Sequence, residues 1–151
     1  MTADQEVPGP QEFVPVAPVV LFEDCLSYAP VTGSVTLARR RAGQVVAEWG
    51  RPELAWSAAL LVSELATNAL LHGCLRGRLF QVRVTLRTDV LRIEVSDARE
   101  ERLPVPRVAG DGDCFGRGLV IVRELADRWG VGPRTVGKTV FAEIGLELPE
   151  R

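Results

Sequence analysis

The sequence predicts an α+β fold, a two-layer sandwich with helices on one face of a mixed, mostly antiparallel sheet. Apolar residues recur with helical spacing in segments 37–49, 52–73 and 119–129, whereas segment 80–96 alternates apolar and polar residues. The expected order is strand, two helices, two strands, long loop, helix and two strands, without an internal repeat. Elements in this order bury their apolar sides best as one helical layer against one sheet.

The 151 residues correspond to one domain of common size. Residues 1–18 contain four prolines and three acidic residues, without the basic start and apolar core of a secretion signal. We therefore expect a disordered lead-in over residues 1–18 and a single domain over residues 19–151.

Composition excludes several classes of protein. The net charge of −2 lacks the basic excess of a protein that tracks nucleic acid, so no direct nucleic-acid partner is expected. No apolar run approaches the roughly 18 residues of a membrane span, so no membrane partner is expected either. Cys25, Cys74 and Cys114 form neither a Cys-x-x-Cys pair nor an even set, which indicates a reducing cytoplasm.

The first half of the domain begins with an expected edge strand at 19–22, extending toward residue 28. After a turn, Ser34 or Thr36 can cap a helix that ends at Gly50. Pro52 suits the first position of a second helix, which we expect to run to Gly73.

The second half begins with a hairpin. Strands 80–87 and 90–96 flank a turn at Asp89, and Asp97 stands at the end of the second strand. The aperiodic stretch 98–115 is an expected long loop, and loops of this length are usually functional lids or disordered segments.

A third helix and a second hairpin complete the chain. The helix is expected to start after Gly116-Arg117-Gly118 and to include Trp129, with Gly130 closing it. Strands 131–136 and 139–148 then flank a turn at Gly137-Lys138.

The second helix carries a polar stripe. Glu64, Asn68 and His72 are spaced at i, i+4 and i+8, so they share one helix face within an otherwise leucine-rich segment. An unpaired buried carboxylate costs several kcal/mol. The stripe therefore indicates a site rather than a packed core.

Two further segments carry candidate chemistry. Gly116 and Gly118 open a helix, where backbone N–H groups and the helix dipole favour phosphate, although such glycines also mark plain turns. Asp97 at a strand end is either a ligand-binding residue or a turn residue.

Together these motifs resemble the GHKL ATP-binding fold of histidine kinases, type II topoisomerases and Hsp90 over about residues 20–148. Glu64-Leu65-x-x-Asn68-Ala69, Val95-Ser96-Asp97 and Gly116-Arg117-Gly118-Leu119 look most like the small anti-sigma-factor-type serine/threonine kinases. The resemblance implies ATP and Mg²⁺ as cofactors, and a sigma factor or an anti-sigma antagonist as protein partner. It also suggests a homodimer.

The resemblance implies a role for each matching residue. Glu64 would be the catalytic base, and Asn68 would ligate Mg²⁺. Asp97 would accept a hydrogen bond from the adenine amino group, with support from Thr139 through its hydroxyl or a water. Gly116 and Gly118 would cradle the phosphates, and Arg117 and His72 would add charge or hydrogen bonds near them. Leu119 would also belong to the cofactor-binding residues.

Several of these residues have a second interpretation. His72 precedes Gly73 and can simply end the helix, and Arg117 can be solvated. The basic run 39–41 is typical of an exposed helix face, which could also contact a partner. The three tryptophans are expected in packing rather than in a ligand site.

The expected function is that of an ATP-dependent protein serine/threonine kinase acting on an antagonist protein. The alternative is a protein-binding module that uses ATP only to set its shape. Ala98-Arg99-Glu100-Glu101 stands where many family members have glycines two and four residues after the aspartate, which favours nucleotide binding over catalysis. A sensor histidine kinase fragment fits poorly, because no phosphoacceptor helix pair is present, and a domain without ligand would leave the polar stripe unexplained.

Overall fold

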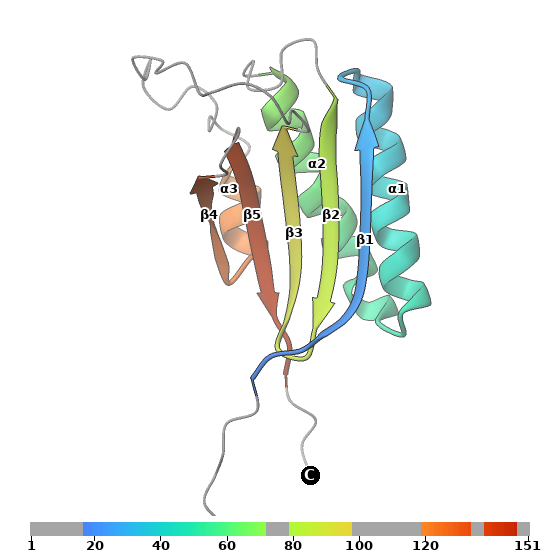
Figure 1. The fold of residues 1–151 in the computed structure, drawn as a ribbon, viewed down its shortest axis with the longest axis vertical. Coiled ribbons are helices and arrows are strands. Elements are labelled where there is room, and N and C mark those ends of the chain that lie inside the picture. Colours follow the sequence, from blue (N-terminus) through green and yellow to red (C-terminus); the bar gives the residue numbers. More distant parts are fainter. Residues whose placement is uncertain (1–16, 72–78, 98–118, 134–137, 148–151) are drawn as a thin grey trace, which may run out of the picture.

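The computed structural model describes residues 17–71, 79–97, 119–133 and 138–147. Its elements, in chain order, are β1 (Val20–Tyr28), α1 (Thr32–Glu48), the 3₁₀ turn η1 (Pro52–Leu54), α2 (Ala55–Leu71), β2 (Phe80–Arg87), β3 (Val90–Asp97), α3 (Leu119–Leu125), β4 (Arg128–Pro133) and β5 (Lys138–Gly145). The strands form one sheet in the order β1-β2-β3-β5-β4, and every neighbouring pair is antiparallel. The helices lie on one face of this sheet, which confirms the predicted two-layer α+β fold (Figure 1).

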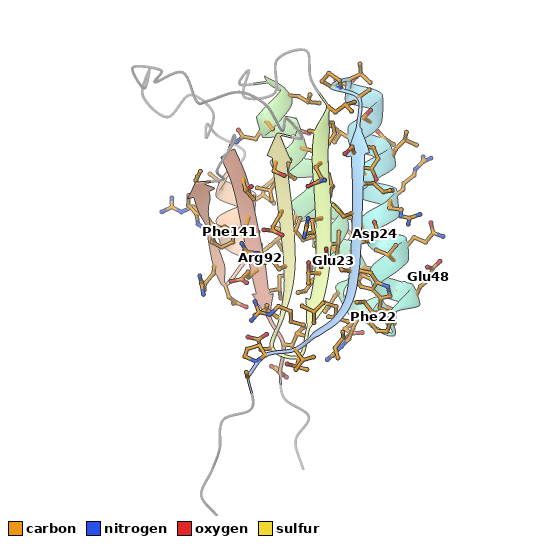
Figure 2. All side chains as sticks on the ribbon, in the orientation of Figure 1. Phe22, Glu23, Asp24, Glu48, Arg92 and Phe141 are labelled. Atoms are coloured by element: carbon orange, nitrogen blue, oxygen red, sulfur yellow. The ribbon has the colours of Figure 1, made fainter. Side chains whose placement is uncertain are left out.

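The core lies between the helical layer and the sheet. Period-two alternation directs Val84 and Ile93, which oppose each other on β2 and β3, toward the helices, where both are almost fully buried. From the helical side, Leu61 and Leu65 of α2 fill the same core. Alternate strand residues such as Arg92 and Phe141 lie on the opposite, polar face (Figure 2).

The structure contradicts the predicted start of α1 and confirms its predicted end. The backbone N–H of Ser34 donates to the Val31 carbonyl at 3.0 Å, and Val31 is the N-cap without a side-chain hydrogen bond. The predicted cap at Ser34 or Thr36 is therefore wrong, because both residues lie inside the helix. The predicted stop at Gly50 is confirmed: its φ of 85° is left-handed, and the N–H of Arg51 donates back to Val46 at 3.1 Å.

Pro52 opens the second helical segment as predicted, through the 3₁₀ turn η1 that leads directly into α2. The described part of α2 ends at Leu71. The predicted end at Gly73 lies outside the described residues, as do residues 1–16 of the predicted lead-in and the predicted loop at 98–115.

The third helix is shorter than the sequence predicts. It ends at Leu125, and Trp129 and Gly130 belong to β4 instead. The helix ends because the residues after it hydrogen-bond to β5. The Asp127 N–H donates to the Glu143 carbonyl at 2.9 Å, and the Asp127 carboxylate accepts a hydrogen bond from the Gly145 N–H at 2.6 Å. Trp129 lies on the helical side of the sheet, opposite Ala142. Its place in the apolar pattern is therefore compatible with a helix and with a strand.

The first strand is clamped to the helical layer. Arg41 of α1 donates to both carboxylate oxygens of Asp24, at 2.7 and 3.3 Å, and this hydrogen bond raises the pKa of Arg41. Burial raises the pKa of Tyr28, and the Asp24 charge adds to that effect while Arg41 opposes it. Both shifts belong to the β1–α1 junction.

Within the described residues, no helix combines the length and the hydropathy needed to cross a membrane.

Candidate functional site

The polar stripe of α2 lies at one edge of the helix's buried face. Asn68 is only 5% exposed, and Glu64, one turn earlier, is half-buried. Between and beside them Leu61 and Leu65 are almost completely buried. The two polar side chains are therefore held against the protein rather than turned to bulk solvent, as the sequence predicted.

The opposite edge of that buried face points to α1. Ser63, Thr67 and Leu70 line a groove shared with α1, and at about 100° per residue they lie across the helix from Asn68. Since α2 packs between α1 and α3, the stripe lies on the side of α2 toward α3. Figure 1 shows this order of the helices behind the sheet.

Two predicted site residues lie on elements that contact α2. Asp97 is the last residue of β3, the strand beneath α2, and it pairs with Phe80 at the start of β2. Leu119 is the first residue of α3. The fold therefore brings together the elements that carry Glu64, Asn68, Asp97 and Leu119. For Asp97 and Leu119 this statement concerns the position of the backbone alone.

Thr139 is not brought to this side of the sheet. It pairs with Ser96 and lines a hollow on the polar face together with Arg92 and Glu94. The expected support of Asp97 by Thr139, through its hydroxyl or a water, stays a prediction. The neighbouring Val140 faces the helices instead, because successive strand residues point to opposite faces.

The remaining predicted phosphate contacts are His72, Gly116, Arg117 and Gly118, which lie outside the described residues. The sequence interpretation did not identify the polar-face hollow, because outward strand positions read as ordinary solvated residues. Only the strand register brings its residues together.

Glu64 and Asn68 supply only part of the set of oxygen ligands that a hard cation needs. Glu64 and Asn68 offer carboxylate and carboxamide oxygens, the atoms that Mg²⁺ prefers. Within the described part of the chain there is no cluster of three or more His, Cys, Asp or Glu side chains that could hold a metal alone. In nucleotide-binding sites, Mg²⁺ is usually bound through one or two carboxylates together with the phosphates of the nucleotide.

Comparison with known families agrees with this arrangement. The family model described as the histidine kinase-like ATPase domain matches residues 29–143, from the end of β1 to within β5. A search of curated proteins finds no match. The matched segment includes α2, the end of β3 and α3, and domains of this family bind ATP, generally with Mg²⁺. The chain belongs to the histidine kinase-like ATPase domain family and is an ATP-binding domain of the GHKL type.

Proposed function

We propose that this protein is an ATP-dependent serine/threonine kinase of the anti-sigma-factor type. Its substrate would be a serine or threonine of an antagonist protein, and its regulatory partner a sigma factor. The observation that carries the proposal is the pairing of half-buried Glu64 with buried Asn68, one turn apart on the side of α2 away from α1. The proposal also places the kinase in the cytoplasm and includes a homodimer.

The proposed chemistry assigns one task to each of these two residues. Asn68 would hold Mg²⁺ through its carboxamide oxygen, and the cation would supply neutralisation of phosphate charge. Glu64 would accept the proton of the substrate hydroxyl as that oxygen attacks the γ-phosphorus and ADP leaves. A half-buried carboxylate suits this role, because the helix fixes its position while it stays within reach of a partner protein.

The nucleotide contacts extend the proposal to residues supported by the family resemblance. Asp97 would accept a hydrogen bond from the adenine amino group, which guanine lacks at that position. Backbone N–H groups of Gly116, Gly118 and Leu119 would cradle the phosphates. His72 and Arg117 would add charge or hydrogen bonds near them.

The test is phosphotransfer from γ-labelled ATP to an antagonist protein, followed by identification of the labelled residue. We expect label on serine or threonine with the wild type and its loss in Glu64→Gln, which keeps size and polarity but cannot accept the proton. Glu53→Gln, an exposed glutamate in η1 before the same helix, serves as the matched control and should keep full transfer. Undiminished transfer in Glu64→Gln would remove Glu64 from the base role.

A second candidate is an ATP-dependent protein-binding module without turnover. The sequence Ala98-Arg99-Glu100-Glu101 favours it, because the glycines that fit the backbone around the nucleotide are replaced. Calorimetry would then show Mg²⁺-dependent ATP binding by the wild type, while no partner acquires label. Label on a partner serine would exclude this candidate.

A further inference from the structure

The groove between α1 and α2 contains a hollow of about 130 Å³. Its lining comes from the first turns of α1 and from the later half of the described part of α2. Figure 1 shows α1 and α2 side by side behind the sheet, with α3 beyond α2. Because the polar stripe of Glu64 and Asn68 lies toward α3, the hollow is separate from the proposed nucleotide site.

The hollow is lined mainly by hydroxyl groups. Each helix contributes two of them at i and i+4 spacing, on the face that meets the other helix, and these residues are Thr32, Thr36, Ser63 and Thr67. Within the described part of the chain, none of the four side chains makes a hydrogen bond. Four hydroxyls are therefore available to a ligand at one place.

The same hollow has a positive charge that is not neutralised. Arg39 is its one charged lining residue, and among the described residues it has no ion pair. Arg41, from the same basic run, differs from it because Asp24 holds its guanidinium at 2.7 Å. The first turn of α1 contains no acidic residue and its N-cap makes no side-chain hydrogen bond, so the positive end of this helix adds to the charge of Arg39.

The size and the donors of the hollow select the class of ligand. Its volume is that of about four water molecules, which suits one small polar group. A carboxylate has two oxygens, and a single guanidinium can satisfy both. A phosphate group has at least three strong acceptor oxygens, which matches a guanidinium surrounded by hydroxyls.

We propose that this hollow binds a phosphate group, either as the free ion or on a phosphorylated serine or threonine side chain. The guanidinium of Arg39 would pair with two of the phosphate oxygens, since its planar N–H groups match them. The surrounding hydroxyls would donate to the remaining oxygens. Val35 and Leu70, the apolar lining residues, would contact the carbon atoms of a phosphorylated side chain. The site does not depend on kinase activity.

The experiment is an NMR titration of the ¹⁵N-labelled protein with sodium phosphate and, separately, with O-phosphoserine, against sodium chloride at the same pH and ionic strength. Saturable shifts of the Thr36, Arg39, Ser63 and Thr67 amide signals are expected with the phosphate probes and not with chloride. Tighter binding of O-phosphoserine would assign the hollow to a phosphorylated side chain, and tighter binding of phosphate would assign it to the free ion.

Two variants remove different parts of the site. Arg39→Gln removes the guanidinium and should raise the dissociation constant at least about tenfold. Thr36→Val keeps the shape of the side chain but removes one hydroxyl, and should raise the dissociation constant about threefold. Arg40→Gln removes the same charge from the next residue, which is exposed and outside the lining, and should leave binding nearly unchanged.

Three results would overturn the proposal. The first is a response to both phosphate probes no larger than to chloride. The second is equal binding by Arg39→Gln and Arg40→Gln, which would indicate a general effect of surface charge. This comparison keeps the proposal testable even if Thr36→Val fails to fold, because both arginines are exposed. The third is a response confined to α3 and to the Glu64 and Asn68 signals, which would place the phosphate at the nucleotide site.

Discussion

At the scale of single residues, Glu64 and Asn68 are polar side chains at positions where packing alone would favour apolar ones. Placing a carboxylate and a carboxamide beside Leu61 and Leu65 removes part of their hydration, which costs free energy that two more leucines would not cost. Their one-turn spacing at the edge of a buried leucine face is what supports a site on α2.

Asn68→Ala should abolish the Mg²⁺ dependence of ATP binding, because it removes the proposed oxygen donor. A tenfold loss of Mg²⁺-stimulated affinity, about 1.4 kcal/mol, is expected by isothermal titration calorimetry with and without Mg²⁺. Asn68→Asp retains an oxygen donor and should retain the dependence. Thr67→Ala, the next residue but on the α1 side of the helix, is the control. An equal Mg²⁺ effect in Asn68→Ala and wild type would contradict the assignment.

At the scale of elements, the end of α1 depends on one backbone conformation. Gly50 has a φ of 85°, which a residue with a Cβ adopts only with strain. Gly50→Ala should therefore lower the free energy of unfolding by about 1 kcal/mol, measured by urea denaturation. Gly33→Ala is the matched control in α1, with nothing within 4 Å of the added Cβ, and should be neutral or slightly stabilising. Equal effects of the two changes would contradict the proposed strain.

The contact between α2 and the sheet depends on buried leucines. Leu61 is fully buried, so Leu61→Ala should lower the free energy of unfolding by about 2–5 kcal/mol. Leu37 on α1 is 59% exposed, and Leu37→Ala should stay within about 0.5 kcal/mol. Chemical denaturation of both variants distinguishes them, and a small loss in Leu61→Ala would show that α2 is not anchored as described.

The elements differ in how well local sequence predicts them. The hairpin of β2 and β3 is predictable, because its alternation is regular and its turn is short. The end of α3 is not, since the apolar spacing through Ala126 and Trp129 continues a helical pattern. Hydrogen bonds between Asp127 and the distant β5, one donated by the Asp127 N–H and one accepted by its carboxylate, end that helix and start β4.

At the scale of the whole molecule, the sequence predicts the layers and the helix that bears the site. The sheet order β1-β2-β3-β5-β4 places β5 between β3 and β4, an arrangement that depends on long-range pairing. Thr139 shows the consequence for the site. Its side of the sheet is decided by register, and a shift of one residue would exchange it with Val140. The relative position of Glu64 and Asn68 follows from helix spacing alone, which needs no such partner.

The most direct test of an adenine nucleotide site between α2 and the end of β3 is a thermal shift measurement. ATP, ADP and GTP are compared with and without Mg²⁺ on the wild type, Asp97→Asn and the turn control Asp89→Asn. ATP with Mg²⁺ at a hundredfold excess over its dissociation constant should stabilise the wild type and the control by about 2.7 kcal/mol. GTP should do much less, and Asp97→Asn should lose most of the ATP effect. An unchanged melting temperature of the wild type with ATP and Mg²⁺ would contradict a nucleotide site in this protein.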